Sequence, residues 1–141
     1  MVTTMKHFDR HLKRLRAVMD GLRFRLEFKP GVEDEMLWSR RVIRIDSERE
    51  DSEIIATLLH EIGHVIAFMH YGKQGARESV HIDVIFHKGK PTRRQTAKII
   101  EQEEDAWRAG EQLAFLMDIP LGSWYAETRA ECLKSYREYL K

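Results

Sequence analysis

A long helical pattern runs through the middle of the chain and carries two histidines one helical turn apart. Ser47 and Glu50 have the spacing of a capping box, and Tyr71-Gly72 predicts the end of the helix. Between them, apolar residues recur every three or four positions: Ile54, Ile55, Leu58, Leu59, Ile62, Val65, Ile66 and Met69. Residues 60–64 read HEIGH, so this amphipathic helix is expected to present His60 and His64 on one face.

Helical and strand patterns alternate in the rest of the chain. We expect helices over 5–20, closed by Gly21, over 92–117 and from 123 to the C-terminus, and strands over 22–28, 37–45 and 80–87. The last of these strands rests on the alternation of Val80, Ile82, Val84 and Phe86 with His81, Asp83 and His87. These elements predict an α+β fold that contains an N-terminal helix, a sheet of three or more strands, the helix with the two histidines, the helix over 92–117 and a C-terminal helix.

Length and composition favour one cytoplasmic domain. The chain has 141 residues, with 24 Lys and Arg against 23 Asp and Glu, so overall charge gives no argument for nucleic acid or membrane as a partner. Residues 1–29 carry eight basic and three acidic side chains, but a solvated positive face is the commoner meaning of such a pattern. Cys132 is the only cysteine, and we expect neither a signal peptide nor a stretch close to the length of a membrane span.

The HEIGH motif predicts a metal centre. Side chains four apart on a helix lie one above the other, so His60 and His64 can both direct an imidazole at one ion. Glu61 points away from that ion but can reach a water beside it and accept its proton. A hydrolytic zinc site also needs a third protein ligand and a position open to water.

Three side chains are candidates for the third ligand. His70 stands where the pattern HExxHxxGxxH has its last histidine, but Ala67 replaces the glycine, and in a continuing helix His70 lies about 120° around the axis from His64. Glu103 and Glu104 lie in the later acidic segment IEQEEDAWRAG, 100–110, where we prefer Glu103.

Glu103 also opens an ExxAW string that resembles the ExxA(D/N) element of gluzincin metallopeptidases. With VIRID, TLLHEIGH and EEDAWRAGEQLAFLMDIP, the central and later half of the chain resembles the compact ImmA/IrrE-like peptidases and minigluzincins. The resemblance implies one zincin-like metallopeptidase domain over 1–141, zinc held by His60, His64 and Glu103, and Glu61 as general base. Trp107 stands where relatives often have an Asp or Asn that bonds a metal-binding histidine.

The resemblance further implies a polypeptide substrate, such as a regulatory protein, paired with the edge of the strand around 41–45. Four side chains are candidates for stabilising an oxyanion: Tyr71, His81, His87 and Tyr125. Two alternatives remain beside the peptidase: a catalytically inactive regulatory module that binds a partner through the same cleft, and a nucleic-acid-binding protein that uses the basic first helix.

Overall fold

The computed structural model describes residues 5–88 and 92–139, without the side chains of residues 38 and 71–88. The elements are α1 (Phe8–Gly21), β1 (Arg25–Lys29), β2 (Glu35–Leu37), the 3-10 helix η1 (Trp38–Arg40), β3 (Val42–Asp46), α2 (Asp51–Lys88), α3 (Arg93–Leu116) and α4 (Ser123–Tyr139). The fold is α+β, as predicted, with four helices and a three-stranded mixed sheet in the described part of the chain.

The sheet has the order β1-β3-β2. β1 runs parallel to β3, with Arg25 opposite Val42, and β2 runs antiparallel to it. Arg44 of β3 links all three strands, because its guanidinium lies 3.4 Å from Glu27 of β1 and 2.8 Å from Glu35 of β2. Since β3 is the central strand, the prediction that a peptide pairs with the edge of strand 41–45 is wrong.

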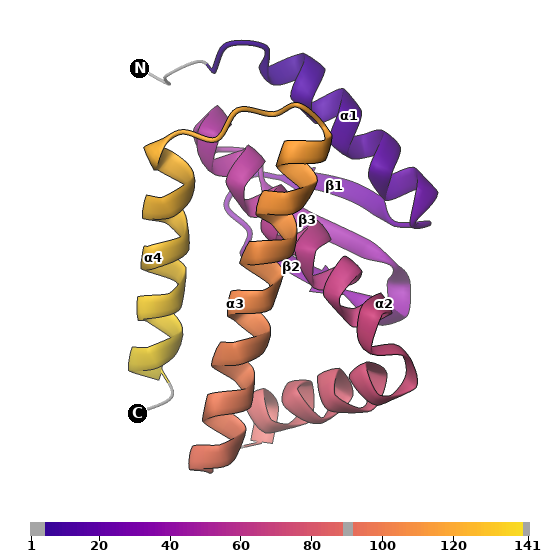
Figure 1. Cartoon of the computed structure of the whole chain (residues 1–141), viewed down its shortest axis with the longest axis vertical. Coiled ribbons are helices and arrows are strands. Elements are labelled where there is room, and N and C mark those ends of the chain that lie inside the picture. Colours follow the sequence, from indigo (N-terminus) through magenta and orange to yellow (C-terminus); the bar gives the residue numbers. More distant parts are fainter. Residues whose placement is uncertain (1–4, 89–91, 140–141) are drawn as a thin grey trace.

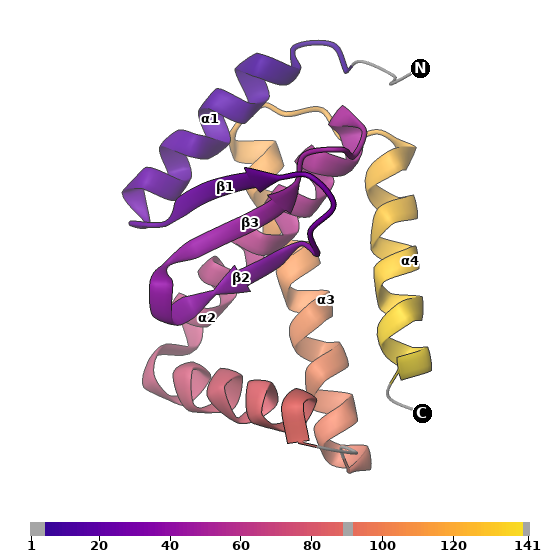
Figure 2. The same cartoon turned by 180° about the vertical axis from the view of Figure 1, so that it is seen from behind.

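α2 lies between the sheet and α3 (Figures 1 and 2). It contacts α1, β3, α3 and α4, and its residues Ile55, Leu58, Leu59 and Ile62 are completely buried. Contrary to our expectation from the sequence, the part Asp51–His70 is long and apolar enough to span a membrane. Because 61% of that stretch is buried inside the domain, its apolar character is accounted for by packing.

α2 begins later and ends later than predicted. Its first residue is Asp51, so Ser47 lies in the preceding turn, where its N–H donates to the carbonyl of Lys29 at 3.1 Å, instead of capping the helix. At the other end the helix continues past Tyr71-Gly72 to Lys88 and changes direction on the way (Figure 1). One or two glycines inside a helix cost about 1 kcal/mol each, which tertiary packing can outweigh.

The predicted strand over 80–87 is therefore wrong, because these residues are helical. The sequence pattern is compatible with a helix as well as with a strand. Val80 and Val84 are four positions apart, as are Ile82 and Phe86, which is helical spacing. Ile85 occupies a position that the strict alternation of a strand would leave polar. The sheet takes its third strand from 35–37 instead, of which only Leu37 fell within the strand predicted over 37–45.

α3 and α4 match their predictions closely. Thr92 caps α3 through a reciprocal pair of bonds with Gln95, which explains why the helix begins at Arg93. α3 then crosses α2 so closely that a Cβ added to Gly63 would lie 2.0 Å from the carbonyl oxygen of Ala106. A Cβ added to Gly110 would lie 2.7 Å from the carbonyl oxygen of Leu59, so both sides of the crossing require glycine.

We predict that Gly63→Ala destabilises the protein by about 1–3 kcal/mol or more, because the methyl group meets helix backbone that cannot move aside. This loss outweighs the roughly 1 kcal/mol that alanine gains over glycine in a helix. The measurement is chemical denaturation of both forms. Gly21→Ala is the control, since nothing lies within 4 Å of its added Cβ, and equal stability of the two variants would contradict the close crossing.

Candidate metal centre

Two histidines of α2 and a glutamate of α3 converge where the two helices cross. Nε2 of His60 lies 2.7 Å from Oε2 of Glu103, and Nε2 of His64 lies 3.1 Å from Oε1 of the same carboxylate. One ligand atom from each residue lies within 4.8 Å of the others. The side chains of His60 and Glu103 are 7% and 8% exposed and that of His64 is 22% exposed, so the cluster can be reached from the His64 side.

The chemistry of these donors fits zinc. Two imidazole nitrogens and a carboxylate oxygen are a common ligand set of hydrolytic zinc sites, which keep one position open. Atoms bound about 2.0–2.1 Å from a tetrahedral zinc ion lie roughly 3.3 Å from one another. The observed nitrogen–oxygen separations of 2.7 and 3.1 Å are close to that value, and one ligand atom from each of the three residues lies within 4.8 Å of the others.

Charge in the cluster is balanced internally. Burial opposes a charge on the His64 imidazole, but the adjacent Glu103 carboxylate outweighs it and raises the pKa of His64 to about 9. Burial likewise opposes ionisation of Glu103, yet His64 and His60 hold the pKa of that carboxyl well below its ordinary value. A cation is therefore favoured at this position, whether it is a proton or a metal ion.

Glu61 lies beside the cluster but is not one of its three converging donors. Its side chain is buried, and its Oε1 lies 3.6 Å from Nδ1 of His60. Burial raises the pKa of Glu61, while His60 and His64 act in the opposite direction. The Glu61 carboxylate therefore lies near Nδ1 of the His60 ring, whereas Nε2 of the same ring faces Glu103.

Trp107 packs against the centre through its ring. The indole stacks on the imidazole of His60, with 4.2 Å between the centroids and 8° between the planes, and so fixes the orientation of that ring. Tyr125 of α4 donates its hydroxyl to the carbonyl oxygen of Trp107. Because Tyr125 is buried and its hydroxyl is engaged there, it serves the packing of α3 and α4 instead of lying open to a substrate.

Two of the other sequence candidates, Glu104 and His70, do not join the cluster. Glu104 points to α4, where its carboxylate lies 3.2 Å from the guanidinium of Arg137. His70 is exposed near the middle of α2. The side chains of Tyr71, His81 and His87 lie outside the described residues. Of the alternatives that the sequence left open, Glu103 is the side chain that meets the two histidines.

The sequence analysis missed Tyr136 of α4. Its half-buried hydroxyl donates to the Glu103 carboxylate, and burial followed by the charge of Glu103 raises the pKa of Tyr136 well above its ordinary value. Cys132, one turn earlier, stays a neutral thiol, because burial and Glu103 raise its pKa to about 12. Residues 103 and 136 lie on different helices, so no local sequence pattern could predict this contact, and it becomes visible only in the packing of α3 against α4.

Asp34, just before β2, is the other neighbour that the sequence analysis missed. Its carboxylate accepts the N–H of Asp46 at 2.8 Å and lies 3.0 Å from Arg49. It is also close enough to His60 for the two charges to interact. The loop before β2 therefore lies within electrostatic range of His60.

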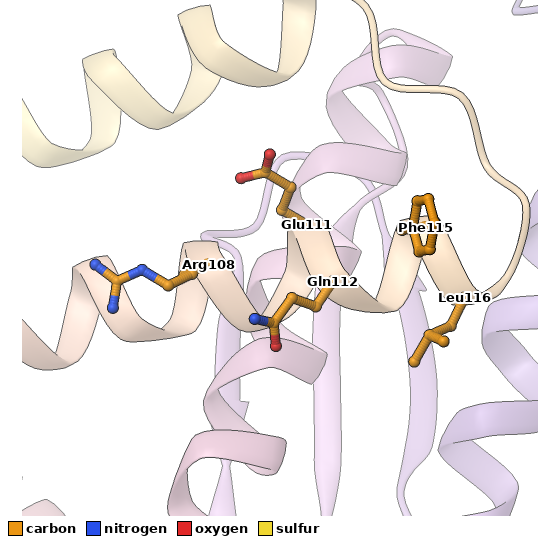
Figure 3. A pocket seen from close by; sticks show the side chains of 5 residues that line it. All are labelled: Arg108, Glu111, Gln112, Phe115 and Leu116. Carbon is orange, nitrogen blue, oxygen red and sulfur yellow. The ribbon is translucent and has the colours of Figure 1, made fainter.

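A separate hollow of about 600 Å³ lies on the outer face of α3 (Figure 3). It is lined by Arg108, Glu111, Gln112, Phe115 and Leu116. The residues of α3 that face the cluster and the core are different ones, including Glu103 and Trp107, so this hollow is not part of the metal centre.

Comparison of the chain with models of known protein families, with curated proteins and with solved structures finds no match.

In the metal-free protein, we predict that stability falls as the pH rises from about 6.5 to about 9. Because the pKa of His64 is raised from 6.5 to about 9 in the folded protein, its charged form stabilises the fold fully below pH 6.5. This contribution is lost as the pH rises through about 9. The measurement is urea denaturation in chelator across this range. Glu103→Gln removes the partner charge and is expected to flatten the dependence; an identical fall in that variant would contradict the assignment.

Proposed function

We propose that this protein is a zinc-dependent peptidase that hydrolyses peptide bonds in polypeptide substrates. The observation that carries the proposal is the convergence of His60, His64 and Glu103 at one buried point with one partly open side. Support also comes from Glu61, a fourth group that lies at the cluster without being one of the three converging donors. The resemblance of the HEIGH and EEDAW segments to gluzincin peptidases points to the same activity.

The chain's own residues account for positioning and proton transfer in this mechanism. His60, His64 and Glu103 would hold a zinc ion, and its Lewis acidity would acidify a water molecule and polarise the carbonyl group of the substrate. Glu61 accepts a proton from the water whose oxygen forms the new bond to the carbonyl carbon. The same proton then passes from Glu61 to the amine nitrogen as the C–N bond breaks, so Glu61 ends in its starting state.

The ring of Trp107 and the close crossing of α2 and α3 at Gly63 keep the two histidines in place for this chemistry. The stacked indole prevents rotation of the His60 ring, and Gly63 lets Glu103 approach both histidines at once. Preorganised groups need no rearrangement at the moment of reaction, which lowers its barrier.

We predict that Glu61→Gln keeps full zinc content and lowers peptide-bond hydrolysis by about 10²–10⁴-fold, because the amide cannot accept the proton. Glu103→Gln is expected to lose most of its zinc, whereas the neighbouring variant Glu104→Gln keeps both zinc and activity, since Glu104 faces Arg137. Metal analysis and digestion of a peptide library by each purified variant provide the measurements.

These variants also separate the peptidase from a regulatory module that only binds its partner. Zinc-dependent cleavage that survives in Glu61→Gln would overturn the role of Glu61. Zinc binding without any cleavage by the wild-type protein would favour the binding module, and equal zinc content in wild type and Glu103→Gln would overturn the centre itself.

We further predict that Tyr136→Phe weakens zinc binding by about 10–100-fold, because a metal-binding carboxylate is held by its own hydrogen-bond donors. The measurement is a competition titration with a chromophoric chelator. Tyr125→Phe is the control: it also loses a buried hydroxyl, but one that bonds the Trp107 backbone, so it should lower stability with little change in zinc affinity. Equal zinc affinities in both variants would contradict a role for Tyr136.

A further inference from the structure

A groove of about 830 Å³ lies between the sheet and α2, next to the candidate metal centre. Its walls come from the end of α1, from β2 and from α2. The walls are largely apolar, and their apolar side chains include Leu22, Phe24, Met36, Leu37, Phe68 and Met69. Met69 is 61% exposed, so a large apolar side chain is presented to whatever enters the groove.

The groove continues the surface that carries the metal-binding side chains. Val65, another lining residue, follows His64 directly, and Phe68 lies one helical turn beyond His64 on the same face of α2. On the opposite wall, β2 contributes Met36 and Leu37. A chain that passes the metal centre along α2 therefore reaches the groove next.

Two arginines give the groove a positive border. Arg23 and Arg41 line it and are exposed, and none of its described lining residues is acidic. The Arg41 guanidinium lies 5.8 Å above the Phe24 ring and 3.4 Å from the carbonyl oxygen of Leu22. Neither arginine has an ion pair within the described residues, whereas Arg44, Arg49, Arg108 and Arg137 all have one.

Both arginines also adopt a backbone conformation that is unfavourable for them. Their φ angles are 63° and 51°, in the left-handed region that glycine and asparagine occupy more readily. Hydrogen bonds hold this geometry: the N–H of Arg25 donates to the carbonyl of Arg41, and the N–H of Phe24 to that of Met19, both at 2.9 Å. Strained residues held in this way are common at binding sites, where side-chain direction matters.

We propose that this groove binds the part of a polypeptide substrate that flanks the cleaved bond, and that it selects a bulky apolar side chain close to an aspartate or glutamate. The inference rests on the proposed peptidase activity and adds the substrate class. The apolar walls take the large side chain, and Arg23 and Arg41 pair with the carboxylate next to it.

The test is digestion of a proteome-derived peptide library by the zinc-loaded protein, with the cleavage sites mapped by mass spectrometry. Wild type is expected to cleave beside bulky apolar residues with Asp or Glu within about two positions. The double variant Arg23→Asn/Arg41→Asn should lose the acidic preference, and kcat/KM for a synthetic peptide of the preferred sequence should fall about tenfold. Asparagine is chosen because it tolerates the left-handed conformation.

A double charge reversal, Arg23→Glu/Arg41→Glu, is expected to move the preference from acidic to basic residues. Its matched control is Arg10→Glu/Arg94→Glu, which changes net charge equally at two exposed positions away from the groove and should leave the cleavage profile unchanged. Cleavage that is zinc-dependent but shows no apolar or acidic preference, or a profile that the groove variants do not alter, overturns this inference alone. No zinc-dependent cleavage by wild type overturns the proposed function and this inference together.

Discussion

The close crossing of α2 and α3 is the constraint on which the candidate centre depends. Gly63 faces the backbone of Ala106, and Gly110 faces the backbone of Leu59, so each helix offers a glycine to the other at a point where a methyl group has no room. Helix axes usually lie 8–10 Å apart because side chains separate them. Removing the side chains on both sides brings backbone against backbone, and this lets a short glutamate side chain reach two imidazoles on the neighbouring helix.

A second consequence of the crossing is that the centre is built on rigid elements. His60, His64 and Glu103 all lie within helices, and the burial of Ile55, Leu59 and Trp107 around them leaves little freedom to rearrange. The Glu103 carboxylate lies within 3.1 Å of both histidine rings, so the three donors already stand close together. Such a site is largely preformed, and binding energy is not needed to assemble it.

The sequence predicted the features that local periodicity encodes. The face shared by His60 and His64 follows from a spacing of four, and the start of α3 follows from Thr92 and Gln95. Pairing between distant segments has no such local signature. The central position of β3 was therefore missed, as was Tyr136, while residues 80–87 satisfied two periodicities at once and the wrong one was chosen. Glu103 was preferred over Glu104 because of the resemblance to gluzincins. The structure explains the difference between these adjacent carboxylates, because Glu103 faces His60 of α2 whereas Glu104 faces Arg137 of α4.

The contribution of α4 to the centre bears on how the protein is made. The histidines lie near the middle of the chain, Glu103 about forty positions later, and the hydroxyl that holds Glu103 comes from Tyr136, close to the last described residue. Translation proceeds from the N-terminus, and the ribosomal tunnel encloses the most recently added residues. The candidate centre thus acquires the Tyr136 hydroxyl only after residue 136 has left the ribosomal tunnel and α4 has packed against α3, so a growing chain that has not yet folded α4 carries an incomplete site.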